Sequence, residues 1–185
     1  MCPKIITFLL ICFSLSFNAH AQKYLTRNGK VTFFSKATIE NIDAINDEVT
    51  SIIDTKKGEV AFNVLIKSFK FKKALMEEHF NENYMESNTY PKASFKGNIV
   101  DISKVNFTKD GTYTLNVKGD LTMHGVTKNL EAPASIIIAG GRLSAISNFK
   151  IKLKDFNIKI PATVVNNIAE LIAVSVECKY EAFKK

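Results

Sequence analysis

Apolar and polar residues alternate with a period of two along most of this 185-residue chain, and that pattern leaves few folds open to it. The alternation is clearest from Glu59 to Lys67, from Tyr113 to Leu121 and from Ile172 to Tyr180. It is typical of antiparallel strands that have one buried and one solvated face. Further strands are expected at Thr32–Ser35, Ile39–Ile45, Val49–Asp54, Ala93–Asp101, Lys128–Ala139 and Leu143–Leu153.

Glycine-containing dipeptides separate these segments and predict turns. Two of them, Asp110-Gly111 and Gly140-Gly141, favour two-residue hairpin loops, in which both central residues need a positive φ. The other predicted turns are Asn28-Gly29, Lys57-Gly58 and His124-Gly125.

One stretch departs from the strand pattern. Residues Lys72 to Phe80 are rich in helix formers and predict a short helix inside the connection between two strands. Roughly eight strands with regular turns indicate an all-β, antiparallel barrel or a sandwich. A barrel of that size is just wide enough to be filled by side chains or to hold one small ligand.

The first 21 residues read as a secretory signal peptide. Lys4 supplies the positive charge, Ile5 to Phe17 form an apolar run too short to span a bilayer, and the small residues Ala19 and Ala21 predict cleavage after Ala21. We therefore expect a periplasmic or secreted protein with one domain over residues 22–185. An uncleaved anchor is the alternative.

Cysteine use follows from that cleavage. Cys2 and Cys12 leave with the signal peptide, so Cys178 remains without an intrachain partner and no intrachain disulfide is expected. A lone cysteine on an alternating strand is more often a small buried hydrophobe than a reactive thiol. The domain must then be stabilised by its core rather than by disulfides.

The formal net charge of +7 comes from lysines spread along the chain, which is typical of a solvated surface. It is also compatible with transient contact with a membrane surface. We find no motif for nucleic-acid binding, for a phosphate loop or for a hydrolase nucleophile. His79 with Glu77 and Glu78 lacks the spacing of a metal site, so no metal and no cofactor are expected.

Two motifs carry a family resemblance. Tyr90-Pro91-Lys92-Ala93-Ser94-Phe95 is followed by a Gly-x-Leu-Thr-x-x-Gly-Val-Thr-Lys run from Gly119 to Lys128. Ile66 to Phe69, His79-Phe80, Phe149 to Ile151 and Lys154 to Phe156 keep the same order and spacing. The sequence resembles the YceI-like family of polyisoprenoid-binding proteins over nearly the whole mature chain.

The resemblance implies a lipocalin-like barrel, export to the periplasm, and a ligand that is a long isoprenoid chain or quinone tail. The protein would hold it as a carrier, a store or a stress-related factor, either alone or as a homodimer, and no catalytic residue is implied. With the alternation, it predicts a lipid-binding wall. The side chains expected in this wall are Phe33, Phe62, Val64, Ile66, Phe95, Ile99, Leu115, Val117, Phe149, Val174 and Val176, with Phe69, Leu75, Phe80 and Met85 near the mouth.

Two other functions fit the same residues. The protein could be an enzyme that acts on an isoprenoid or a similar amphiphile through His79 or His124, or through a buried acid such as Asp155. It could also be a structural or interaction module whose barrel is filled by side chains, because alternation alone does not distinguish a core from a cavity. The Gly125 turn is expected to be structural, with the glycine supplying a positive φ.

Overall fold

The computed structural model describes residues 23–36, 41–161, 164 and 168–183. The predicted signal peptide at residues 1–21 lies outside the described residues, as does the start of the strand expected at Ile39–Ile45.

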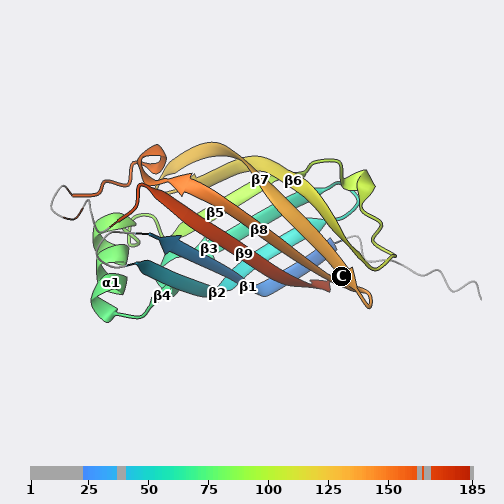
Figure 1. The fold of residues 1–185 in the computed structure, drawn as a ribbon, viewed down its shortest axis with the longest axis horizontal. Helices are drawn as coiled ribbons and strands as arrows, with labels where there is room; N and C mark the ends of the chain where they lie inside the picture. Colours follow the sequence, from blue (N-terminus) through green and yellow to red (C-terminus); the bar gives the residue numbers. More distant parts are fainter. Residues whose placement is uncertain (1–22, 37–40, 162–163, 165–167, 184–185) are drawn as a thin grey trace, which may run out of the picture.

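Eight long antiparallel strands form a closed barrel (Figure 1). Around the barrel the order is β1-β9-β8-β7-β6-β5-β3-β2, and pairing of β2 with β1 closes the sheet. The two-residue strand β4 (Lys70–Phe71) adds to β2 at one end. The long strands are β1 (Lys23–Ser35), β2 (Ile42–Asp54), β3 (Glu59–Leu65), β5 (Lys92–Ile99), β6 (Gly111–Met123), β7 (Val126–Ala139), β8 (Arg142–Lys152) and β9 (Leu171–Ala182). The antiparallel barrel predicted from the alternation is confirmed.

The turn predicted at Asn28-Gly29 is wrong, because these residues lie inside β1 at a shift in register with β2. Gly29 is needed there for close packing: a Cβ at this position would lie 2.6 Å from the Cys178 sulfur. The strands expected at Ile39–Ile45 and Val49–Asp54 are likewise one strand, β2, which continues past this irregularity with Val49 paired to Gly29.

The tight hairpins are only partly as predicted. His124-Gly125 and Gly140-Gly141 are two-residue loops in which all four residues have positive φ, as type I′ turns require. Asp110-Gly111 is not a hairpin loop: β5 and β6 are joined by residues 100–110, which contain a 3₁₀ turn at Ile102–Lys104. The Asp110 carboxylate instead accepts a hydrogen bond from the Gly140 amide at 3.0 Å.

The predicted helix is present as α1 (Ala74–His79) and continues as a π-helical turn at Phe80–Tyr84. It lies at one end of the barrel, beside the ends of β1 and β2 (Figure 1). Short 3₁₀ turns at Ile66–Ser68 and Leu153–Phe156 follow β3 and β8. We call the end of the barrel that carries α1 and these two turns the α1 end.

The opposite end of the barrel is tightly packed. Ile53, Ile136, Leu143 and Cys178 are each at most 3 % exposed and belong to one apolar cluster with Tyr180. Cys178 is therefore buried, as the strand pattern predicts. We call the end that this cluster packs the closed end.

Candidate functional site

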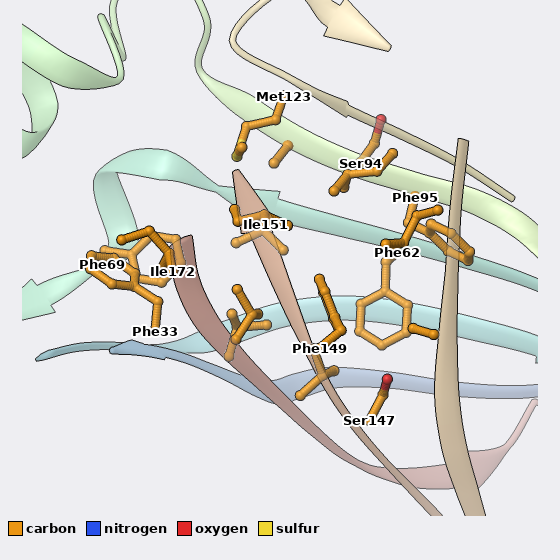
Figure 2. A pocket seen from close by; sticks show the side chains of 18 of the residues that line it. Phe33, Phe62, Phe69, Ser94, Phe95, Met123, Ser147, Phe149, Ile151 and Ile172 are labelled. Atoms are coloured by element: carbon orange, nitrogen blue, oxygen red, sulfur yellow. The ribbon is translucent and has the colours of Figure 1, made fainter. Parts of the chain in front are cut away.

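A large apolar cavity occupies the barrel, with a volume of about 380 Å³. Its wall is drawn from all eight long strands and from the connection that contains α1. In Figure 2 the side chains of Phe62, Phe149 and Ile151 converge on it, while Phe33 and Phe69 lie together at one side. The barrel is therefore not filled by its own side chains, and the filled-barrel alternative does not describe it.

Burial along the strands shows where the empty space lies. Inward residues near the closed end, such as Val60 and Ile99, are buried. Inward residues farther along the strands, such as Phe149 and Val174, are only half-buried although they line the cavity. Wall residues at the α1 end, such as Ile66, Met85 and Met123, are buried again. The cavity therefore lies between two packed groups of residues, one at each end of the barrel.

Four phenylalanine rings form a cluster at the α1 end. The Phe80 ring lies 5.5 Å from Phe33, 5.5 Å from Phe69 and 5.0 Å from Phe71, measured between ring centroids. Such separations are those of favourable aromatic pairs. The cluster joins the α1 connection to β1, β4 and the turn after β3, and it forms part of the cavity wall.

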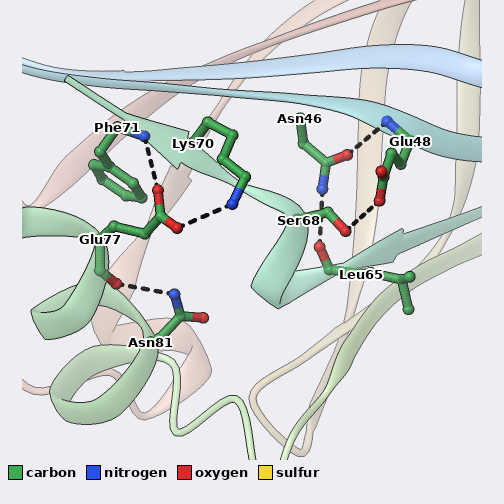
Figure 3. Close-up of polar contacts among 8 residues, drawn as sticks. All are labelled: Asn46, Glu48, Leu65, Ser68, Lys70, Phe71, Glu77 and Asn81. Carbon is green, nitrogen blue, oxygen red and sulfur yellow. Dashed lines mark hydrogen bonds and ion pairs between the residues drawn. The ribbon is translucent and has the colours of Figure 1, made fainter. Parts of the chain in front are cut away.

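Polar bonds fix the same connection from outside (Figure 3). The Glu77 carboxylate accepts hydrogen bonds from the Lys70 ammonium at 3.1 Å and from the Phe71 amide at 3.3 Å. Asn81 donates to the Glu77 carbonyl at 2.9 Å. Because Lys70 and Phe71 form β4, these bonds attach the helix to the sheet.

A second polar group orders the turn after β3. The buried Asn46 side chain donates to the Leu65 carbonyl at 2.8 Å and accepts from the Glu48 amide at 2.9 Å. The Ser68 hydroxyl donates to Glu48 at 2.6 Å. This turn carries Phe69, so the network positions one of the four rings of the cluster.

The π-helical turn changes which side chains reach the cavity. The Met85 amide donates to the Phe80 carbonyl at 2.9 Å, a five-residue spacing that stacks Phe80 and Met85 on one side. His79 and Tyr84 are related by the same spacing, and all four residues contribute to the wall. Burial raises the pKa of the Tyr84 phenol, so it stays neutral.

Several polar groups of the wall already have partners. The Ser147 hydroxyl donates to the Pro133 carbonyl at 2.8 Å, and Ser35 accepts from the Ala169 amide at 2.8 Å. At the closed end Tyr180 and Ser51 share a hydrogen bond of 2.8 Å, and burial raises the pKa of Tyr180 well above its usual value. Burial also raises the pKa of the Cys178 thiol to about 11. These hydroxyl groups are therefore already hydrogen-bonded before any ligand enters.

Fourteen of the fifteen residues predicted to bind lipid lie in the cavity wall. The exception is Leu75, which is 60 % exposed and points away from the cavity on α1. The positions found are Phe33, Phe62, Val64, Ile66, Phe69, Phe80, Met85, Phe95, Ile99, Leu115, Val117, Phe149, Val174 and Val176. Their contact with a lipid stays a prediction.

The sequence reasoning missed other wall residues. Ile151 and Ile172 continue the alternation of strands already predicted, so the pattern could have identified them. Phe71, Met76 and Tyr84 lie in the short or irregular elements at the α1 end, where neither a period of two nor a regular helix assigns a face.

Of the candidate catalytic groups His79, His124 and Asp155, only His79 lines the cavity. His124 lies outside the cavity wall, and its ring nitrogens face the Phe156 carbonyl at 3.0 Å and the Glu86 carboxylate at 3.3 Å. It therefore ties the β6–β7 turn to two neighbouring loops. His79 is exposed at the α1 end, and Asp155 is exposed rather than buried.

Neither a metal-holding group of side chains nor a membrane-spanning helix occurs in the described part of the chain. No three His, Cys, Asp or Glu side chains within it are placed to hold a metal ion. None of its helices has the length and apolar character needed to cross a membrane.

Comparison with known proteins gives a consistent picture. Residues 15–180 match the family model of the YceI-like domain. Protein YceI of Shigella flexneri is 36% identical over 101 residues, which cover 51% of this chain and 48% of that protein. The chain thus spans about half the length of the curated relatives it matches.

Solved structures share the fold at low sequence identity. A polyisoprenoid-binding domain from Saccharophagus degradans, implicated in plant cell wall breakdown, has a TM-score of 0.76 at 16% identity and covers 89% of this chain and 100% of its own. BcnA of Burkholderia cenocepacia has a TM-score of 0.67 at 18% identity, covering 83% and 96%. These similarities show a common lipocalin-like barrel.

Proposed function

This chain belongs to the YceI-like family, and we propose that its barrel holds a long isoprenoid-type lipid, a polyisoprenoid or the tail of an isoprenoid quinone. The observation that carries the proposal is the large apolar cavity, in which wall groups such as the Tyr180 and Ser147 hydroxyls are already hydrogen-bonded. A ligand with many polar groups would leave them unpaired in such a site, which is costly. A hydrocarbon chain has no polar groups, so it leaves no hydrogen bond unmade in the cavity.

The energetics favour a chain of several isoprene units. Burial is worth about 0.8 kcal/mol per CH₂-sized group, so each five-carbon unit contributes up to about 4 kcal/mol before the costs of binding are subtracted. The cavity volume of about 380 Å³ falls within the range of roughly 300–1,000 Å³ typical of small-molecule sites. Useful affinity then requires no polar anchor and no catalytic group.

The biological role we propose is that of an exported binding protein rather than an enzyme. The signal-like first 21 residues support export to the periplasm or beyond. The solved relative from Saccharophagus degradans is described by the lipid class it binds, which supports a binding role here too. Carriage between membranes, storage and a stress-related role all use the same bound state.

Native mass spectrometry of the protein purified from its own compartment tests the proposal. We expect co-purified lipid, or uptake of added isoprenoid quinone by lipid-free protein. Ala145→Phe places a ring in the half-buried wall of β8 and should weaken uptake about tenfold or more, because the ring and the lipid compete for the same volume. Leu115→Phe is a smaller addition to the wall on β6, two strands away in the sheet.

Ser144→Phe is the matched control, since Ser144 is the neighbour of Ala145 on β8 and does not line the cavity. It should take up lipid like the unmodified protein. A protein that stays empty with every isoprenoid tested would refute the proposal, as would unchanged uptake by both wall variants when circular dichroism shows them folded.

A further inference from the structure

Large apolar side chains are exposed preferentially at the α1 end. The described residues include six such side chains, and four of them, Phe34, Leu65, Leu75 and Leu171, lie at this end. Phe34 is the second-last residue of β1 and Leu65 the last residue of β3. Leu171 is the first residue of β9, and Leu75 is on α1. We call these four residues the docking rim.

The remaining two exposed apolar residues lie at the closed end. Val100 follows β5 and donates its amide to the Asn116 carbonyl, and Phe183 donates to the carbonyl of Lys23, the first residue of β1. The distribution is therefore biased toward the α1 end.

Strand pairing sets a lysine beside two of the three strand residues of the docking rim, whereas Phe34 pairs with Asp43 of β2 and Ala173 of β9. Leu65 of β3 pairs with Lys92 of β5. Leu171 of β9 pairs with Lys152 of β8.

Phe34 and Lys150 lie on opposite sides of β9, with Ala173 between them. Both pair with Ala173, from the β1 side and from the β8 side, so they flank this small residue. An outer groove of about 240 Å³ lies between them.

The charges of these lysines are available. Lys92, Lys150 and Lys152 are exposed and form no ion pair with any other residue that the structure describes. Two other lysines at the same end are already neutralised: Lys70 contacts Glu77 at 3.1 Å and Lys72 contacts Asp43 at 2.9 Å. The free positive charges thus lie next to the exposed apolar side chains.

The rim occupies one continuous arc of the barrel. In the sheet order β8, β9, β1, β2, β3 and β5 are consecutive neighbours, and β4, which precedes α1, pairs with β2 in the middle of this arc. Figure 1 shows α1 at this position beside the ends of β1 and β2. The four rim residues and the lysines beside them therefore lie on neighbouring elements at one end of the barrel.

We propose that the docking rim binds the surface of an anionic lipid bilayer. Exposed apolar side chains that alternate with lysines match such a surface, because the apolar groups enter the boundary between headgroups and acyl chains while the lysines contact anionic headgroups. The lysines set the charge complementarity that favours this partner. The inference rests on the proposed function, because a membrane is where an isoprenoid lipid is collected and delivered, and docking places the α1 end of the barrel against it.

Sedimentation with lipid vesicles tests the proposal. We expect the protein to bind vesicles of phosphatidylcholine mixed with phosphatidylglycerol, to bind phosphatidylcholine alone more weakly, and to lose binding as salt screens the lysines. Replacing Lys150 and Lys152 by glutamine should weaken binding by about fivefold per lysine.

A rim variant carries Phe34→Thr, Leu65→Thr, Leu75→Gln and Leu171→Thr. We expect it to lose binding to the mixed vesicles by about tenfold or more. A control variant carries Val100→Thr and Phe183→Thr at the closed end, and it should bind like the unmodified protein.

The vesicles contain no isoprenoid, so docking and lipid uptake can fail separately. The rim residues do not line the cavity, so the rim variant should still take up a quinone presented in detergent. Equal loss of vesicle binding in the rim and control variants would overturn the proposal. So would a dimer that the rim variant converts to a monomer while the unmodified protein ignores anionic vesicles, because the rim would then cover a second copy of the chain.

Discussion

Replacing Phe80 by alanine should test whether the phenylalanine cluster holds the α1 connection onto the barrel. The ring of Phe80 is within 5.0–5.5 Å of three others, from β1, β4 and the turn after β3. No other ring in the cluster belongs to the α1 connection. The substitution therefore removes the aromatic link between this connection and the sheet.

The expected loss follows from burial and from the ring pairs. Full burial of a phenylalanine makes a change to alanine cost about 3–5 kcal/mol. Phe80 is half-buried because part of its ring faces the cavity, which lowers that figure, whereas each aromatic pair adds roughly 0.5–1.5 kcal/mol beyond area. We expect the free energy of unfolding to fall by about 2–3 kcal/mol.

Urea denaturation measures this loss, and hydrogen exchange of the amides from Ala74 to Met85 detects local opening of the connection. Leu75→Ala is the control, since Leu75 is in the same helix but 60 % exposed, and it should change stability by no more than about 0.5 kcal/mol. If Phe80→Ala matched Leu75→Ala in both stability and exchange, the cluster would not be what holds this segment.

Two further predictions concern the turns and the closed end. Gly125→Ala should destabilise the protein more than Gly141→Ala. The backbone strain is similar, since φ is +73° at Gly125 and +74° at Gly141, but only at Gly125 would the new Cβ contact a ring, that of Tyr90 at 2.7 Å. Thermal unfolding compares the two variants, and equal losses of stability would mean that the Tyr90 ring moves aside freely. Burial raises the pKa of the Cys178 thiol from 9.0 to about 11, so the folded state holds this proton more tightly than the unfolded state. The thiol's contribution to stability is complete below about pH 9 and should be lost as the pH rises toward about 11, by roughly 2 kcal/mol. Urea midpoints across that range should fall less steeply in Cys178→Ala, and parallel curves would contradict the assignment.

The strands were predictable because alternation reports a local property, the face on which each side chain lies. Glu59–Leu65 and Leu171–Ala182 were found in this way, as were the wall residues they carry. Glycine was a weaker guide, because it serves two purposes. At Gly140 it supplies a positive φ, whereas at Gly29 it makes room for the Cys178 sulfur, and the two cases look alike in sequence.

The α1 connection was harder to predict because its geometry is irregular. Leu75, Phe80 and Met85 were all expected near the mouth, but only Phe80 and Met85 lie in the cavity wall. Residues five apart do not share a face of an α-helix, so the π turn that starts at Phe80 is what places Phe80 and Met85 on one side. Leu75, in the regular helix before this turn, lies in solvent. The change in helical period depends on packing against the phenylalanine cluster. No pattern within the segment itself encodes it.

Whether an eight-stranded barrel is filled or hollow depends on the size of its inward side chains at each level. At the closed end these are large, including Ile136 and Tyr180. Farther along, two small side chains of the cavity wall, Ala134 of β7 and Ser147 of β8, are direct partners across the ladder. Neither fills the space in front of it, and the neighbouring inward residues Phe149 of β8 and Val174 of β9 remain half-buried. The cavity is thus encoded by small residues at adjacent inward positions, a signal that becomes readable only once the register of β7 against β8 is known.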